Sequence, residues 1–236
     1  MDGRITDLEA RRIDLAGKIE LPKLERFGSS QEDVKGLIGQ IAEIVNNPER
    51  YIDHGGVGTV YEVTDNVCVK VLEPRHESPV AHLMDLGRPV DVEVGIQRSI
   101  CHVEVAGVRA PWVYGYIKGD GKEVKSIIIM ERLDAVNLQH ILNGTEQFPE
   151  GYDAQVFVDA LEEYLDHIHE KFGIVHGDLE PRNVMVDKKT GLPRLIDFGR
   201  SHIVSSHNNT QRQSLIDQDN EQFSDIFEKL LGNIEI

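Results

Sequence analysis

The sequence HGDLEPRN, residues 176–183, decides the fold together with LIDFG, residues 195–199. Asp178 and Asn183 lie in the first segment, and Asp197 lies in the second. An aspartate can orient a hydroxyl group and accept its proton, whereas Asn and Asp supply the oxygen ligands that Mg²⁺ prefers. A single surface Asp or Asn is usually a turn former. Three of them in this order, with strand-like segments between them, favour a metal-dependent active site.

Two features earlier in the chain suit a bound polyphosphate. The glycine-rich segment HGGVGTV, residues 54–60, lies between two strand-like segments, and its glycines let the backbone approach phosphate closely. Lys70 then follows in the apolar segment VCVK, where a buried amine needs an anionic partner. The alternative for Lys70 is an edge-strand lysine with its amine in water. Asp53 precedes this segment, and a carboxylate pointing inward there would repel phosphate.

The apolar periodicity changes along the chain from strand-like to helical. Period-two alternation predicts strands between residues 51 and 71, with a hairpin turn at 64–66, and at 112–117 and 126–131 around a turn at 119–121. Helical spacing predicts helices in the second half of 80–103, at 136–142 and 153–172, and a last amphipathic helix that includes 223–231. Short strands are expected at 184–186 and 195–196. This order predicts an α+β protein with two lobes.

Residues 1–50 read as a helical extension. Ser29 and Glu32 form a candidate capping box. The apolar residues beyond it recur at helical spacing and are Val34, Leu37, Ile38, Ile41 and Val45. The turn-forming sequence Asn46-Asn47-Pro48 is expected to end this helix. The apolar face suits packing on the following domain, and a docking surface for another protein is the alternative.

Composition narrows the classes of function. The chain has 236 residues and a formal net charge of −16, which argues against nucleic acid or an anionic membrane as the main partner. The charge is compatible with a basic protein partner or simply with solubility. No apolar run approaches the ~20 residues that span a bilayer, and the N-terminus carries no secretory signal. The two cysteines, Cys68 and Cys101, form no disulfide framework, so a reducing, cytoplasmic location is expected.

Taken together, these features resemble the signature set of the protein-kinase superfamily. The glycine-rich segment, Lys70, the loop at 176–183 and the Asp-Phe-Gly sequence occur in the expected order between Tyr51 and Arg200. The resemblance implies an α+β, two-lobed kinase-like fold that uses ATP and Mg²⁺. It would have a helical extension at 1–50, a strand-rich N-lobe at 51–133 and a shortened helical C-lobe at 134–236.

The resemblance also implies a role for each site residue. Asp178 would be the catalytic base, and Asn183 and Asp197 would hold Mg²⁺. Lys70 would hold the α- and β-phosphates and pair with Glu93, with Glu77 and Asp91 as rivals. The other nucleotide-binding residues would be Gly55, Gly56, Gly58, Val60 and the backbones of Glu131 and Leu133. Met130 would lie behind the adenine or fill the core, and Cys68 would be a small residue near the base.

Departures from the family pattern concern the catalytic loop and the C-terminal segment after Gly199. Gly177 stands where many regulated kinases have arginine, and this form resembles aminoglycoside phosphotransferases. Glu180 replaces a lysine usual in serine/threonine kinases, so Arg182 is predicted to supply the missing positive charge, or else to pair with Glu180 or cap a helix. After Gly199 only 37 residues remain and no Ala-Pro-Glu motif occurs, as in RIO-type kinases, the small kinase of the KEOPS complex and some bacterial effector kinases.

The last helix offers two aspartates with a further expected role. Asp217 or Asp219 would brace the catalytic loop, although an N-cap is the simpler role for Asp219. The function expected from the whole pattern is transfer of the ATP γ-phosphate to a protein hydroxyl, Ser/Thr rather than Tyr. The alternatives are a small-molecule phosphotransferase and an ATP-binding switch or ATPase that acts through a partner protein.

Overall fold

The computed structural model describes residues 19–20, 41, 43–54, 58–72, 90–118, 125–204 and 209–231. The chain divides into two compact units, one made of residues 1–91 and 113–132 and the other of 92–112 and 133–236. Residues 92–112, which the sequence analysis placed in the N-lobe, thus group with the second unit. Most of the expected N-terminal helix lies outside the described residues. Ile41, Glu43 and Ile44 are helical, and a 3₁₀ helix occurs at Pro48–Arg50.

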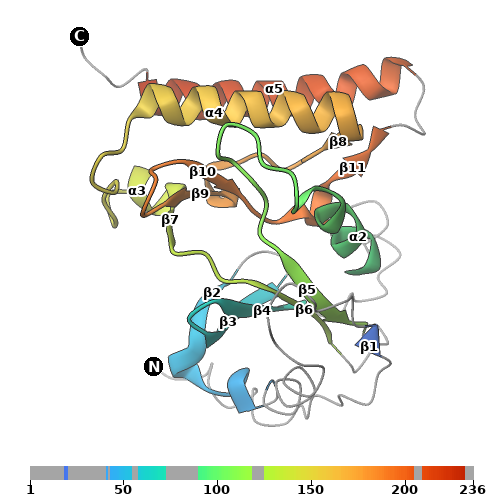
Figure 1. Ribbon diagram of the computed structural model, residues 1–236, viewed down its shortest axis with the longest axis vertical. Coiled ribbons are helices and arrows are strands. Elements are labelled where there is room, and N and C mark those ends of the chain that lie inside the picture. The colour runs from blue at the N-terminus through green and yellow to red at the C-terminus, as the bar shows by residue number, and fades with distance from the viewer. Residues whose placement is uncertain are drawn as a thin grey trace, which may run out of the picture. The chain divides into compact units, whose positions relative to one another are not determined.

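The first unit is built on a six-stranded antiparallel sheet with the order β1-β5-β6-β4-β3-β2 (Figure 1). Its strands are β1 (Ile19–Glu20), β2 (Tyr51–His54), β3 (Gly58–Thr64), β4 (Val67–Leu72), β5 (Val113–Ile117) and β6 (Ser126–Glu131). β3 and β4 are joined by the turn at Asp65–Asn66, so the predicted hairpin is confirmed. β4 lies between β6 and β3 in this sheet. Side chains on both of its faces are buried. The expected turn at 119–121 lies outside the described residues.

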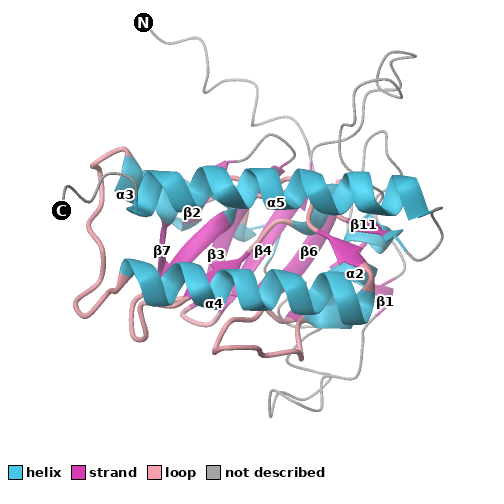
Figure 2. Ribbon diagram, turned by 90° about the horizontal axis from the view of Figure 1, so that it is seen from above, coloured by secondary structure: helices cyan, strands magenta, loops and turns pink. Residues whose placement is uncertain are grey.

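The second unit is mainly helical. Its helices are α2 (Val90–Ile100), whose first two residues fall in the first unit, α3 (Leu138–Leu142), α4 (Ala154–His167) and α5 (Asn209–Leu231). Its strands are β7 (Ala135–Asn137), β8 (Ile174–Val175), β9 (Val184–Asp187), β10 (Pro193–Leu195) and β11 (His202–Ile203). They form a three-stranded sheet, β10-β9-β7, and a two-stranded ribbon, β11-β8. α4 and α5 lie side by side (Figure 2).

α4 forms because its start is capped and one face is apolar. The Asp153 carboxylate accepts a hydrogen bond from the Val156 amide at 3.0 Å, which satisfies an amide that has no partner within the helix. The face that packs into the core consists of Phe157, Val158, Ala160, Leu161, Tyr164 and Leu165. A π-helical turn at Ile168–Phe172 continues the helix, and Gly173, with φ +60°, ends it. The predicted helix at 153–172 is confirmed, with a wider final turn.

The prediction of a helix at 136–142 is wrong for its first two residues, because the helix α3 begins at Leu138. Val136 and Asn137 are in strand β7, because their backbone pairs with Val186 and Met185 of β9. Asn137 then caps α3 by accepting a hydrogen bond from the Gln139 amide at 2.9 Å. In the described part of the chain, no helix has the length and apolarity needed to cross a membrane.

Candidate active site

In the first unit, β3 and β4 bring together three residues expected to contact nucleotide. Val60 lies directly opposite Lys70 in the antiparallel register, so both side chains are on one face of the sheet. Lys70 is only 6% exposed, which excludes the alternative of a solvated edge lysine. At Gly58, an added Cβ would lie 2.5 Å from the carbonyl oxygen of Val71, so the close strand contact requires glycine. Gly55 and Gly56 lie outside the described residues.

Asp53, which stands at the start of the glycine-rich segment, is tied to its own strand. It is exposed on β2, opposite Val60, and its Oδ1 accepts a hydrogen bond from the His54 amide at 2.8 Å. His54 Nδ1 lies 2.9 Å from the hydroxyl of Thr59 across the same hairpin. The Asp53 carboxylate is therefore partly engaged by the local backbone.

Cys68 lies beside the strand expected to contact adenine. Its thiol donates a hydrogen bond of 3.5 Å to the carbonyl oxygen of Glu131, and it lies opposite Met130 in the β4–β6 register. Burial raises the pKa of the Cys68 thiol to about 12. The thiol is therefore protonated at neutral pH and unsuited to thiolate chemistry. Glu131 and Leu133 fall in different units, and their shared contact with adenine stays a prediction.

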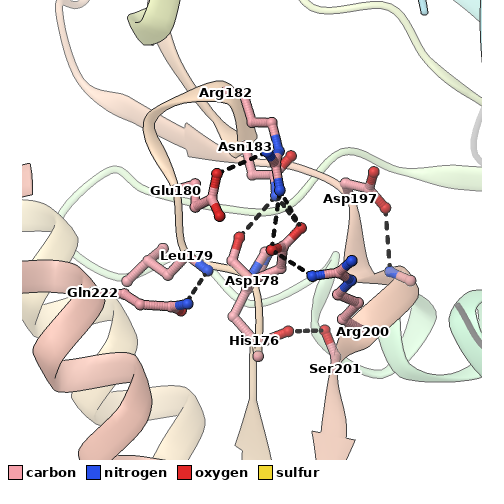
Figure 3. A network of polar contacts seen from close by, with 12 residues as sticks. His176, Asp178, Leu179, Glu180, Arg182, Asn183, Asp197, Arg200, Ser201 and Gln222 are labelled. Atoms are coloured by element: carbon pink, nitrogen blue, oxygen red, sulfur yellow. Dashed lines mark hydrogen bonds and ion pairs between the residues drawn. The ribbon is translucent and has the colours of Figure 1, made fainter. Parts of the chain in front are cut away.

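In the second unit, the loop at 176–183 surrounds one carboxylate with donors (Figure 3). Asn183 Nδ2 donates to Asp178 Oδ2 at 2.9 Å. Arg182 Nη2 lies 3.2 Å and 3.3 Å from the two carboxylate oxygens. Arg200 Nη1 lies 3.2 Å from Oδ1. Asn183 and Arg182, predicted as site residues in the same loop as Asp178, thus both contact its carboxylate, and Arg200 joins them.

Asn183 is oriented by its surroundings. It is buried, and its amide nitrogen donates to the backbone carbonyl oxygen of Asp178 at 2.7 Å as well as to the carboxylate. The backbone carbonyl oxygen of Asn183 accepts a hydrogen bond from the Ile196 amide at 2.9 Å, which links the loop to the residue directly after β10. Because the NH₂ group of Asn183 donates its hydrogen bonds to Asp178, the carboxamide oxygen is the atom of this side chain that can bind a cation.

Asp197 adopts a backbone conformation that is uncommon for a residue other than glycine. Its φ and ψ angles are +61° and +75°, and its Oδ1 accepts a hydrogen bond from the Gly199 amide at 3.2 Å. Such strained residues cluster at functional sites. A Cβ at Gly199 would lie 3.1 Å from Asp197 Oδ1 and 3.3 Å from Glu93 Oε2, so both carboxylates lie against this glycine. Glu93 is 2% exposed, but Lys70 falls in the other unit and their ion pair stays a prediction.

Helix α5 supports the loop through a buried aspartate. Asp219 accepts hydrogen bonds from the amides of His176 at 2.6 Å and Gly177 at 2.8 Å, and contacts His169 Nε2 at 3.0 Å. α5 begins at Asn209, so the N-cap interpretation of Asp219 is wrong and the bracing interpretation is confirmed. Asp217 is exposed and contacts Gln213 at 2.8 Å instead.

Gly177 is required by backbone geometry. Its φ angle is +73°, and an added Cβ would lie 2.6 Å from the carbonyl oxygen of Arg200. The neighbouring His176 is fully buried, with Nε2 3.0 Å from the carbonyl oxygen of Ile196 and its ring edge-on to Phe198. His176 therefore packs as a structural residue of the loop.

Ser201, whose hydroxyl donates to the His176 carbonyl oxygen at 3.0 Å, and three further residues that contact the loop were missed by the sequence analysis. Gln222 Oε1 accepts a hydrogen bond from the Leu179 amide at 2.8 Å, and Asn137 Nδ2 donates to the Arg182 carbonyl oxygen at 2.8 Å. The third is Arg200. Its position directly after Asp-Phe-Gly was the available signal, whereas nothing local marks Gln222 or Asn137. Arg182 also pairs with Glu180 at 2.8 Å, so a contact supports two of its three interpretations, positive charge beside Asp178 and pairing with Glu180.

The family model that describes the protein kinase domain matches residues 47–217 of this chain. The chain belongs to the protein kinase family. This match includes the glycine-rich segment, the catalytic loop and the Asp-Phe-Gly sequence, and it ends within α5. The kinase fold, with its strand-rich and helical parts, is therefore established.

Individual relatives are distant. The chain is 27% identical over 168 residues to the mitogen-activated protein kinase kinase kinase nsy-1 of Caenorhabditis elegans, covering 66% of this chain and 10% of that protein. It is 24% identical over 170 residues to the probable serine/threonine-protein kinase PknB of Lactococcus lactis, covering 70% and 25%. The chain thus spans a quarter or less of these two relatives. A solved structure of WbdD matches with a TM-score of 0.50 and 21% identity, over 72% of this chain and 36% of that one, which supports the fold alone.

Proposed function

We propose that this chain is an ATP-dependent kinase that phosphorylates a protein hydroxyl, serine or threonine in preference to tyrosine. The observation that carries the proposal is the contact of Asp178 with Asn183 inside a loop braced by Asp219. Family membership supports the reaction class, and similarity to the probable serine/threonine-protein kinase of Lactococcus lactis supports the choice of acceptor. A cytoplasmic location is part of the proposal.

The chemistry follows from the positions of the charged groups. The acceptor oxygen attacks the γ-phosphorus, the bond from that phosphorus to the bridging oxygen breaks, and ADP leaves with the electron pair. Asp178 orients the acceptor hydroxyl and takes its proton. Arg182 offers positive charge beside Asp178, where the transferring group gains negative charge. In the first unit, Lys70 would hold the α- and β-phosphates under the glycine-rich segment.

The donor atoms fit a magnesium site. The carboxamide oxygen of Asn183 and the carboxylate of Asp197 are hard oxygen ligands, which Mg²⁺ prefers. Among the described residues, no group of three or more His, Cys, Asp or Glu side chains could hold a metal, so phosphate oxygens and water would complete the coordination. When bound, Mg²⁺ would neutralise charge on the phosphates.

Gly177 bears on the choice between protein and small-molecule acceptors. His-Gly-Asp alone favours small-molecule phosphotransfer by resemblance. However, the positive φ angle and the Arg200 contact require glycine at position 177 whatever the acceptor is. The net charge of −16 supports a basic protein as substrate or partner.

The proposal is tested by labelled-phosphate transfer from ATP to a protein array. Asp178→Asn is expected to abolish transfer while ATP with Mg²⁺ still raises the melting temperature. Asp197→Asn should reduce both, and Asp217→Asn, an exposed substitution on α5, should change neither. Equal transfer by Asp178→Asn and wild type would overturn the assignment of the base.

A further inference from the structure

The carboxylate of Asp178 has its acceptor sites filled by the protein itself. Two contacts reach Oδ1, one from Arg182 and one from Arg200, and two reach Oδ2, one from Arg182 and one from Asn183. An ionised carboxylate has about four lone-pair sites. A substrate hydroxyl can therefore donate to Asp178 only after one of these contacts is released.

The contact with Arg200 is the easiest to release. Asn183 is buried and also holds the Asp178 backbone, and Arg182 is additionally held by Glu180 at 2.8 Å. The Arg200 side chain is 44% exposed, and among the described residues Asp178 is the one carboxylate that it contacts. The Asp178 side chain is only 11% exposed, but Asn183 and Arg182 still contact its carboxylate when Arg200 leaves.

The backbone of Arg200 is held by contacts that do not involve its side chain. The carbonyl oxygen of Arg200 packs against Gly177, 2.6 Å from the position that a Cβ atom would take there. Arg200 is also the last residue of the 3₁₀ helix Phe198–Arg200. The guanidinium is thus tethered beside the catalytic loop on a flexible stem. A phosphoryl group offers Arg200 more than its single 3.2 Å contact with Asp178, because guanidinium can bind phosphate through two parallel hydrogen bonds.

We propose that Arg200 exchanges between two anions, pairing with Asp178 in the resting site and with the transferring phosphoryl group during the reaction. This exchange frees Asp178 to accept the hydroxyl proton and adds positive charge where negative charge develops. The inference rests on the proposed function, since it concerns the same site. It adds Arg200 to the residues that contact the reacting group.

The test uses ADP with Mg²⁺, with and without aluminium fluoride as a mimic of the transferring phosphoryl group. For Arg200→Ala, ADP affinity should stay within about twofold of wild type, while the gain in affinity from aluminium fluoride falls about tenfold, as expected for one lost charge-assisted contact. In transfer assays, kcat should fall by a similar factor with KM for ATP little changed. Arg200→Lys should restore part of both effects.

The control is Arg212→Ala, which removes an exposed arginine of α5 and should change neither measurement. Unchanged aluminium fluoride enhancement in Arg200→Ala, or unchanged or faster turnover, would overturn the exchange. The failure of the proposed function would look different, because wild type itself would then neither bind ADP with Mg²⁺ nor transfer phosphate.

Discussion

The carboxylate of Asp219 lies 2.6 Å from the backbone nitrogen of His176, although the two residues are 43 positions apart in the chain. The same side chain holds the Gly177 amide and contacts His169. Helix α5 thereby fixes the start of the loop that carries Asp178 and Asn183. The last helix is therefore part of the machinery that positions the site.

Replacing Asp219 should destabilise the protein strongly. Asp219→Leu leaves one buried and one partly buried backbone amide without this acceptor, and losses of this kind typically cost about 3 kcal/mol of unfolding free energy. Urea unfolding would measure the change in midpoint. Asp217→Asn, two residues away on the exposed side of α5, should shift it by less than ~0.5 kcal/mol. Equal shifts for the two variants would contradict the bracing role.

Gly177→Ala should cost more than the same change at Gly144. Both glycines have a positive φ angle, +73° and +74°, so alanine carries a similar backbone penalty of about 1 kcal/mol at each. Only at Gly177 would the new Cβ meet an atom, the Arg200 carbonyl oxygen, whereas nothing lies within 4 Å at Gly144. We expect an extra cost of about 1–3 kcal/mol. Denaturant melts of the two variants give this difference directly, and equal melts would argue against the tight contact.

Lys70→Ala should weaken nucleotide binding. ATP with Mg²⁺ at about a hundred times its Kd stabilises a native protein by about 2.7 kcal/mol, which raises the melting temperature of a chain this size by roughly 5–10 °C. The variant should lose most of this rise, while Lys189→Ala, at an exposed turn, should keep it. Absence of any rise in wild type at millimolar nucleotide would remove the kinase activity from consideration.

Arg182→Ala should lower transfer by one to two orders of magnitude, about 1.4–2.7 kcal/mol of transition-state stabilisation. The reason is loss of positive charge beside Asp178, and ATP affinity should change little. Arg182→Lys should rescue the rate only partly, because lysine lacks the planar fork. Glu180→Gln removes the other ion pair of Arg182 and should leave most of the rate intact. An Arg182→Ala protein that is less stable but fully active would show that the arginine is only structural.

Asp187 should make stability depend on pH on the acid side. Burial alone would raise the pKa of Asp187, but hydrogen bonds from Thr190 and the nearby Arg194 guanidinium hold it below its usual range. Its contribution to stability is therefore complete above the unfolded-state pKa of about 3.9 and is lost as the pH falls through the lower folded-state value. Asp187→Asn should be destabilising at pH 7, and the difference from wild type should shrink below about pH 4. A difference that does not change with pH would contradict this.

Local patterns in the sequence predicted most of the elements. Period-two alternation located β3, β4 and β6, and the turn residues between β3 and β4 fixed their pairing. The spacing of Asp178 and Asn183 was equally informative, because Pro181 begins the short 3₁₀ helix Pro181–Asn183, which ends with Asn183 in contact with Asp178. These features depend on neighbours in the chain, so they can be read without a structure.

The same local rules failed where a distant partner decides the outcome. Val136 and Asn137 fit a helical pattern, but the free backbone edge of β9 pairs with them and makes them a strand. Asp219 is a residue type that often caps a helix, but α5 begins ten residues before it. Its carboxylate instead accepts a hydrogen bond from the buried His176 amide of the catalytic loop.

The sequence by itself therefore determined the kinase family and most of the order of the elements, and it predicted Lys70, Asp178, Asn183 and Asp197 as site residues. These follow from spacing and residue chemistry. Only the tertiary structure decided that Asp219 holds the loop and that Gly177 makes room for Arg200. It also decided that Arg200 reaches Asp178. The physical reason is that a buried hydrogen bond or a backbone contact forms between segments that packing brings together, and no local pattern encodes which segments those are.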